Sequence, residues 1–235
     1  MKHIHKGSPP RELRDWFEEQ PVVDRRRINC GYDDMPTNVK AAVKERLLHE
    51  QGGLCCYTGL RIASENSHIE HFKPQSLCTD HEDVAYTNLL AAYPGASAGG
   101  CPFGAHAKDD WHDEQLLVSP LHQRCESQFR FDQFGAVDSS DEQDAAALET
   151  IERMRLNHIS LSEIRQRAID EALFPDNRRL SKAQLQRLIE GLYSRNTNGR
   201  FPALCFVIKD VAQDLLRKAE RERRRKQAMR GQSRS

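Results

Sequence analysis

The chain has 235 residues, with 38% hydrophobic and 30% charged side chains, and its 35 basic residues balance 35 acidic ones. This composition suits one globular unit, or a small catalytic core with a helical appendage, and excludes a disordered chain. No apolar run approaches the ~20 residues of a membrane span, and no apolar signal segment follows the first residues, so we expect a cytoplasmic location. A function on nucleic acids would have to explain how a neutral protein finds a polyanion.

The cysteines are odd in number and come without a secretion signal, which argues against a disulfide framework. Reduced thiols are therefore the default, and metal binding remains possible. The cysteines are Cys30, Cys55, Cys56, Cys78, Cys101, Cys125 and Cys205.

Residues 1–36 carry prolines and glycines among charged residues, with one short predicted helix over residues 11–19. This pattern indicates an arm outside the core. The helix offers two aromatic residues, Trp16 and Phe17, which could form a partner surface. We expect them to fold back on the body instead.

A second helix is predicted from Asn38 to about Gln51, because apolar residues recur on one stripe, Thr37 can cap its start and two glycines stop it. Two short strands follow, over residues 54–57 and 68–72. Glu70 and His71 would close the second strand.

Residues 74–87 are mostly polar and without a steady period, which predicts a loop that folds back and returns at Asn88. After a run of small residues at 94–100, a helix is expected to begin near His106. Strand, strand and helix then follow one another in a ββα pattern.

The rest of the chain is predicted to be mainly helical. Residues 129–137 alternate like a small hairpin, and Ser140 would cap a helix over residues 141–157. Further helices are expected over residues 161–174 and 180–193 and from Pro202 past Leu216. The fold class is therefore α+β and mainly helical, with an arm at 1–36, a ββα core at 37–138 and a helical region at 139–235.

Residues 217–230 form a charge run rich in arginine. Such a run is most often a frayed, solvated tail, and a contact with nucleic acid or an acidic partner is the sharper alternative.

The acid–histidine pair at residues 70 and 71 suits phosphodiester hydrolysis, which needs a cation at the phosphate and a base for the attacking water. His71 is the candidate base, since an unperturbed histidine is largely neutral at cellular pH. Glu70 offers the hard oxygen that Mg²⁺ prefers, and His106 could complete a two-residue clamp.

Three further residues near the pair receive weaker assignments. Asn88 could orient the site, either directly or by pinning the loop. Lys108 lies close enough to His106 to touch a phosphate as a substrate-binding residue, but an ordinary helix-surface lysine fits as well. His68 could stack on substrate, but we expect an ordinary histidine at a strand edge.

Four segments of the sequence resemble the HNH endonucleases, whose fold is the ββα-metal finger. They are residues 56–59, 70–76, 88–90 and 101–108. Residues 1–7, 119–135 and 150–157 are similar to the PtuB-type branch of that family, which extends the resemblance over about two-thirds of the chain.

The resemblance implies a role for each candidate residue. In HNH nucleases the histidine of the acid–histidine pair is the general base, the acidic residue and a later His or Asn bind the divalent metal, and a middle Asn is structural. These roles would fall on His71, on Glu70 with His106, and on Asn88, with Mg²⁺ or Mn²⁺ as the cofactor.

The PtuB branch contains the nuclease subunits of Septu and certain retron anti-phage systems of bacteria, which work beside PtuA, an ABC-type ATPase. The resemblance therefore implies a DNA endonuclease in a hetero-oligomeric complex with such an ATPase. An RNase that acts on tRNA in abortive infection and a non-enzymatic nucleic-acid-binding adaptor remain alternatives. We expect the arm with Trp16 and Phe17, or the C-terminal helices, to contact the ATPase.

Two features depart from the family pattern. Many members hold a structural zinc with two Cys-x-x-Cys pairs, but Thr58 and Gly59 follow the Cys55-Cys56 pair here, so we expect no structural zinc. The usual spacing to Lys108 also places the third motif position on Ala105 rather than His106. Asp109 and His112 are the possible substitutes as second metal ligand.

Overall fold

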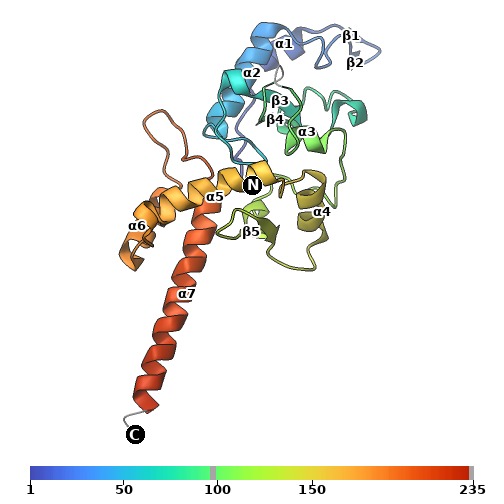
Figure 1. Cartoon of the computed structure of the whole chain (residues 1–235). Coiled ribbons are helices and arrows are strands. Elements are labelled where there is room, and N and C mark those ends of the chain that lie inside the picture. The colour runs from blue at the N-terminus through green and yellow to red at the C-terminus, as the bar shows by residue number, and fades with distance from the viewer. Residues whose placement is uncertain (96–98, 233–235) are drawn as a thin grey trace.

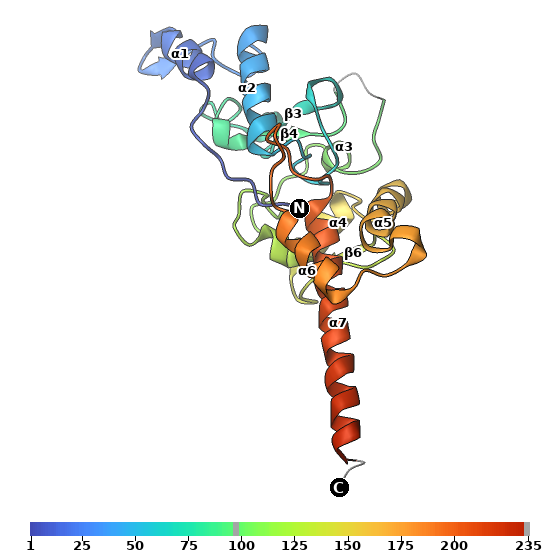
Figure 2. The same ribbon diagram turned by 90° about the vertical axis from the view of Figure 1, so that its left-hand side faces the viewer.

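Two groups of elements meet along the first residues of the chain, as Figures 1 and 2 show. The computed structural model describes residues 1–95 and 99–232, so residues 96–98 of the predicted small-residue run lie outside the described residues. The fold is α+β and mainly helical, as the sequence predicts. The helices are α1 (Arg11–Glu19), α2 (Thr37–Glu50), α3 (Ala105–Lys108), α4 (Ala145–Arg153), α5 (Ile159–Leu173), α6 (Lys182–Gly191) and α7 (Cys205–Gln232).

The strands of the described residues form antiparallel pairs. They are β1 (Val22–Val23) with β2 (Arg26–Arg27), β3 (His68–His71) with β4 (Leu89–Ala92), and β5 (Phe129–Phe131) with β6 (Val137–Ser139). Together with α1, α2 and α3, the β3–β4 pair makes up one group of elements, and β5, β6, α4, α5 and α6 gather around the start of α7 in the other (Figure 1). The predicted hairpin at 129–137 is confirmed.

Helix α2 buries the predicted apolar stripe through Val39, Val43 and Leu47. It stops where Gly52 and Gly53 adopt positive φ, a conformation that glycine takes without steric cost. The predicted cap is wrong by one position. Proline 36 is already extended at the cap position, so Thr37 is the first helical residue and makes no capping hydrogen bond.

The predicted strand at 54–57 is also wrong. Apart from one isolated bridge between Leu54 and Arg61, this segment forms a tight turn, in which the amide of Gly59 donates to the carbonyl of Cys55. The predicted second strand exists as β3, but it pairs with β4. The register places Glu70 opposite Leu90 and His71 opposite Leu89.

The outer edge of β4 is closed by the side chain of Gln51, the residue directly after α2. The Gln51 Oε1 atom accepts a hydrogen bond from the amide of Ala91, while Nε2 donates to the carbonyls of Ala91 and Leu54. All residues of β4 are fully buried. The two-stranded sheet is therefore embedded between α2 and the turn at 54–63, which makes β3 a rigid support.

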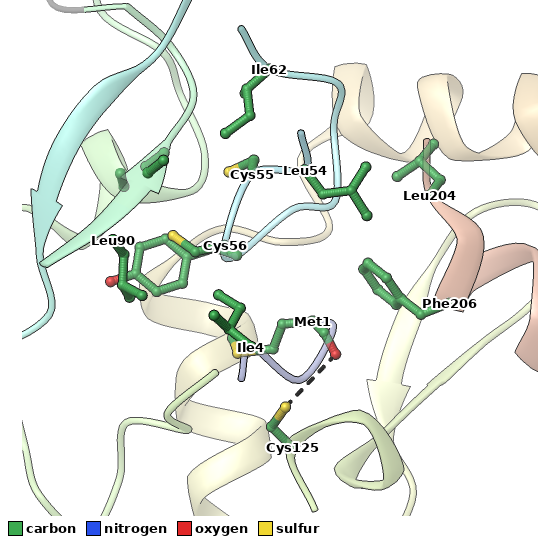
Figure 3. Packing of buried hydrophobic residues seen from close by; sticks show 14 of the residues in the cluster. Met1, Ile4, Leu54, Cys55, Cys56, Ile62, Leu90, Cys125, Leu204 and Phe206 are labelled. Atoms are coloured by element: carbon green, nitrogen blue, oxygen red, sulfur yellow. Dashed lines mark hydrogen bonds between the residues drawn. The ribbon is translucent and has the colours of Figure 1, made fainter. Parts of the chain in front are cut away.

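The first residues of the chain are buried, contrary to the predicted arm. Met1 and Ile4 are 2% and 5% exposed and lie among Cys56, Cys125 and Phe206 in Figure 3. The amide of Ile4 donates to the carbonyl of Pro120. The arm prediction is wrong here because these apolar side chains fill the space between the turn at 54–62 and the start of α7.

Helix α1 has the predicted bounds and folds back on the body. Trp16 is 9% exposed, and Phe17 packs edge-on against His81. Folding back is thereby confirmed, and Trp16 is not available as a partner surface. The cysteines are all free thiols, as predicted, and Cys205 is buried at the start of α7.

Helix α4 begins later than predicted, because Asp144 caps it by accepting from the amide of Ala147. Ser140 does not cap a helix. Its amide donates to the carbonyl of Gln128 and prolongs the β5–β6 pairing.

Helix α7 is buried against α5 and α6 near its start and then leaves the body as a rod (Figure 2). The expected fraying of the charge run is wrong, since the helix continues to Gln232. Among the described residues, no helix is long and apolar enough to cross a membrane.

Candidate active site

Strand β3 and the turn of helix α3 border a pocket of about 530 Å³. It is lined by Glu70 and His71 from β3 and by His106 and Lys108 from α3. The structure thus brings together four of the predicted site residues, while Asn88 lies behind them. The pocket also receives His68, which was predicted to be an ordinary histidine at a strand edge.

His71 is held as a neutral imidazole with a defined tautomer. Its Nε2 lies 2.9 Å from the backbone oxygen of Asp83, and because a carbonyl only accepts, Nε2 carries the proton and Nδ1 is the basic nitrogen. The ring packs edge-on against Tyr32, with centroids 4.5 Å apart. Burial lowers the pKa of His71 below its ordinary 6.5 and outweighs the hydrogen bond to Asp83. This is the state that a general base needs.

Asp83 joins two parts of this arrangement. While its carbonyl orients His71, its carboxylate accepts a 2.6 Å hydrogen bond from the amide of Tyr32. The ring and the residue that orients it are therefore fixed to each other.

Glu70 is almost buried, at 9% exposed, and its two carboxylate oxygens have different partners. Oε1 accepts from the hydroxyl of Tyr57 at 3.2 Å and from the ammonium of Lys108 at 3.0 Å. Oε2 lies 3.3 Å from Nε2 of His68. Burial raises the pKa of Glu70, but the hydrogen bond from His68 and the charge of Lys108 together bring it below its ordinary value. Glu70 is therefore a carboxylate.

Lys108 is an internal partner of this carboxylate. The side chain is buried, and its Nζ lies within 3.3 Å of Glu70 Oε1 and of the backbone oxygens of His71 and Asp109. An ammonium has three N–H donors, so all are used. This placement corrects both expectations for Lys108, an exposed phosphate contact and a helix-surface lysine. A one-turn helix is too short for a sequence period to reveal which side is buried.

Asn88 pins the loop that precedes it. Its Oδ1 accepts from the amide of Lys73 at 2.7 Å, and its Nδ2 donates to the carbonyls of Lys73 and Glu82. Of the two roles considered from the sequence, the contacts match the second. The loop so held contains Asp83, so Asn88 acts on His71 through the backbone and is a positioning residue.

His106 faces the pocket, but its hydrogen bonding does not match the expected ligand role. Its Nδ1 accepts from the amide of Cys101 at 3.0 Å, which leaves the proton on Nε2. Among the contacts of the described residues, none joins His106 to Glu70. Of the two substitutes, Asp109 lines the pocket, whereas the His112 ring packs edge-on against Phe72.

The side chains of the pocket offer too few ligands to enclose a divalent cation, but enough for one that also binds a substrate phosphate. Within the described part of the chain, no group of three or more His, Cys, Asp and Glu side chains is arranged to hold a metal ion. However, Mg²⁺ keeps several waters and needs only one or two protein ligands when a substrate phosphate completes its shell. Glu70 with a neighbouring histidine supplies such a pair.

Three residues contact the site in ways that were not predicted, and only one of them could have been recognised from the sequence. His68 stands two positions before Glu70, and alternation along a strand places both side chains on one face. Asp83 acts on His71 through its backbone carbonyl, for which the sequence carries no signal. Tyr57 reaches Glu70 from a turn whose position only the fold defines.

Neither a scan against protein-family models nor a search of curated proteins found a match to this chain. The function of the chain is therefore inferred from the residues of the pocket and their geometry.

Proposed function

We propose that the chain is a metal-dependent endonuclease of the HNH type, in which β3, β4 and α3 form the ββα finger. One observation carries the proposal. A neutral histidine with its Nε2 proton fixed on the Asp83 carbonyl directly follows an ionised, nearly buried glutamate in the chain, and both residues line one pocket. This places a base and a cation ligand next to each other, which is the combination that phosphodiester hydrolysis requires.

In this proposal His71 removes the proton from the attacking water. The proton moves to Nδ1, because Nε2 is already protonated, and Asp83 and Tyr32 keep the ring in place during the transfer. Glu70 would hold Mg²⁺ or Mn²⁺, which when bound polarises the phosphate and stabilises the leaving oxygen. Lys108 keeps the Glu70 carboxylate ionised and oriented.

DNA is the proposed substrate, and the charge distribution supports a polyanion. Residues 217–235 contain nine basic and two acidic residues, a net charge of +7, so residues 1–216 carry −7 in a chain of zero net charge. Exposed basic residues therefore gather on the outer part of α7, away from the body (Figure 1). A polyanion is attracted to that end of the molecule.

We further propose that the chain works with a PtuA-type ATPase in an anti-phage complex. The acidic body repels DNA, so α7 alone would hold the substrate unless a partner adds to its grip, and such a partner can keep the nuclease silent. The C-terminal helices are the proposed contact, because Trp16 is buried against the body.

The test is cleavage of supercoiled plasmid by the purified chain, alone and with the ATPase, in Mg²⁺ or Mn²⁺. We expect cleavage that chelation abolishes and that His71→Ala removes while the thermal unfolding midpoint stays near that of the wild type. Unchanged cleavage by His71→Ala would refute the assignment. Sequencing the nucleic acids of cells in which the system is triggered separates DNA breaks from tRNA fragments.

A further inference from the structure

We infer that His68, rather than His106, is the second protein ligand of the divalent cation beside Glu70. This inference rests on the proposed function and specifies its metal site. It moves the second ligand from helix α3 to strand β3.

The position of His68 matches that of a ligand that shares a cation with Glu70. The two residues stand two apart on β3 and point to the same face, and both line the pocket. Nε2 of His68 and Oε2 of Glu70 are 3.3 Å apart. Two neighbouring ligands of an octahedral Mg²⁺, each about 2.1 Å from the ion, are about 3 Å from each other. The observed separation is thus close to what a shared cation requires.

Hydrogen bonds to the other ring nitrogen favour the same assignment. A histidine ligand needs one unprotonated nitrogen, and its other N–H is commonly held by a backbone carbonyl. Nδ1 of His68 lies 2.5 Å from the carbonyl oxygen of Pro94, so it donates there. In His106 the order is reversed, since Nδ1 accepts from the Cys101 amide and Nε2 keeps the proton.

The partners of Glu70 leave one oxygen for the cation. Tyr57 and Lys108 both contact Oε1, and among the contacts of the described residues only His68 reaches Oε2. A divalent cation at Oε2 would lie on the side of Glu70 that faces His68, with Lys108 still on the opposite oxygen.

The residue at the start of α3 cannot bind a cation, which favours a ligand from β3. Ala105 lines the pocket, but its methyl side chain has no donor atom. The first turn of α3 therefore offers no ligand at this position, and β3 supplies one from the other side of the pocket.

The experiment measures binding of Mn²⁺ alone to the metal-free full-length protein, by isothermal titration calorimetry and by electron spin echo spectroscopy of the bound ion. We expect His68→Ala to weaken Mn²⁺ binding at least about tenfold and to remove the ¹⁴N modulation of a histidine ligand. His106→Ala should stay within about twofold of the wild type and keep that modulation.

A second variant separates ligation from folding. His68→Asp replaces the nitrogen by a hard oxygen donor, so it should bind Mn²⁺ better than His68→Ala yet show no ¹⁴N modulation. Modulation that persists in His68→Asp and disappears in His106→Ala would overturn the inference and leave the nuclease proposal standing. Absence of both Mn²⁺ binding and metal-dependent cleavage in the wild type would overturn the proposed function, and the inference with it.

Discussion

Charged side chains are buried and paired in the pocket at β3 but exposed and mostly of one sign on the outer part of α7. In the pocket, Glu70 is nearly buried and neutralised by Lys108 and His68 at fixed distances. On α7, residues 217–226 are rich in exposed arginine and lysine, with Glu220 and Glu222 as the acidic residues among them. Buried, prearranged charges serve a reaction, whereas exposed, unbalanced charges serve attraction over a distance. Rate and affinity should therefore be separable by mutation.

The largest effect is expected at His71. Loss of a general base costs about 10²- to 10⁴-fold in rate, so His71→Ala should lower kcat by this factor and leave DNA binding unchanged. Single-turnover cleavage and fluorescence anisotropy measure the two quantities. His112→Ala is the matched control, because that ring packs on Phe72 and does not line the pocket. Equal losses in DNA binding and in rate would show that His71 does not act on the rate alone.

The second effect concerns stability. Lys108→Met leaves the carboxylate of Glu70 buried with one cation fewer, which should cost about 3–5 kcal/mol in the free energy of unfolding. Lys218→Met removes an ion pair with Asp214 on the exposed surface of α7 and should change it by less than about 1 kcal/mol. Urea denaturation measures both variants. Similar values would show that the two regions do not differ in this respect.

The third effect concerns affinity. The triple variant Arg221→Gln, Arg224→Gln and Arg225→Gln should weaken DNA binding for all sequences and reduce the slope of log K against log salt by up to about 0.9 per lost phosphate contact. The maximal cleavage rate should not change. Arg167→Gln on α5 is the control for an exposed arginine elsewhere. A salt slope equal to that of the wild type would exclude α7 from DNA binding.

The smallest effect is the pH dependence of the rate near neutrality. In the proposed reaction neutral His71 is the active form, so the rate should fall as the pH drops through its pKa. Because burial lowers this pKa below 6.5, the protein should keep more than about half of its pH 7.5 rate at pH 6.5. Arginines on α7 do not titrate in this range, so DNA binding should stay constant. A midpoint above 6.5 would contradict the placement of His71.

The sequence predicted those helices and strands in which buried apolar residues recur at regular spacing. The bounds of α1, the stripe of α2 and the hairpin of β5 and β6 come from apolar residues at regular spacing. The place of Glu70 and His71 at the end of β3 followed in the same way. The predicted cap at Thr37 was wrong because Pro36 takes the cap position, and the one at Ser140 because the β5–β6 pairing extends to that residue.

What the sequence could not reveal depends on contacts between distant segments. Burial of Met1 and Ile4 requires the start of α7, which lies some 200 residues later. Strand β3 pairs with β4, which contains the buried Leu89 and Leu90, and not with the apolar residues 54–57 that lie nearer in the sequence. In the candidate site, the Asp83 carbonyl and the buried position of Lys108 are likewise consequences of tertiary structure.

The Gln51 side chain also determines how the β3–β4 pair could be moved to another protein. A fragment that began at Leu54 would lose the acceptor for the Ala91 amide and present an open strand edge, which invites pairing with another chain. The smallest piece that can move between proteins without self-association therefore starts with α2. Recombination that separated this helix from the strands would yield a β3–β4 unit prone to aggregation.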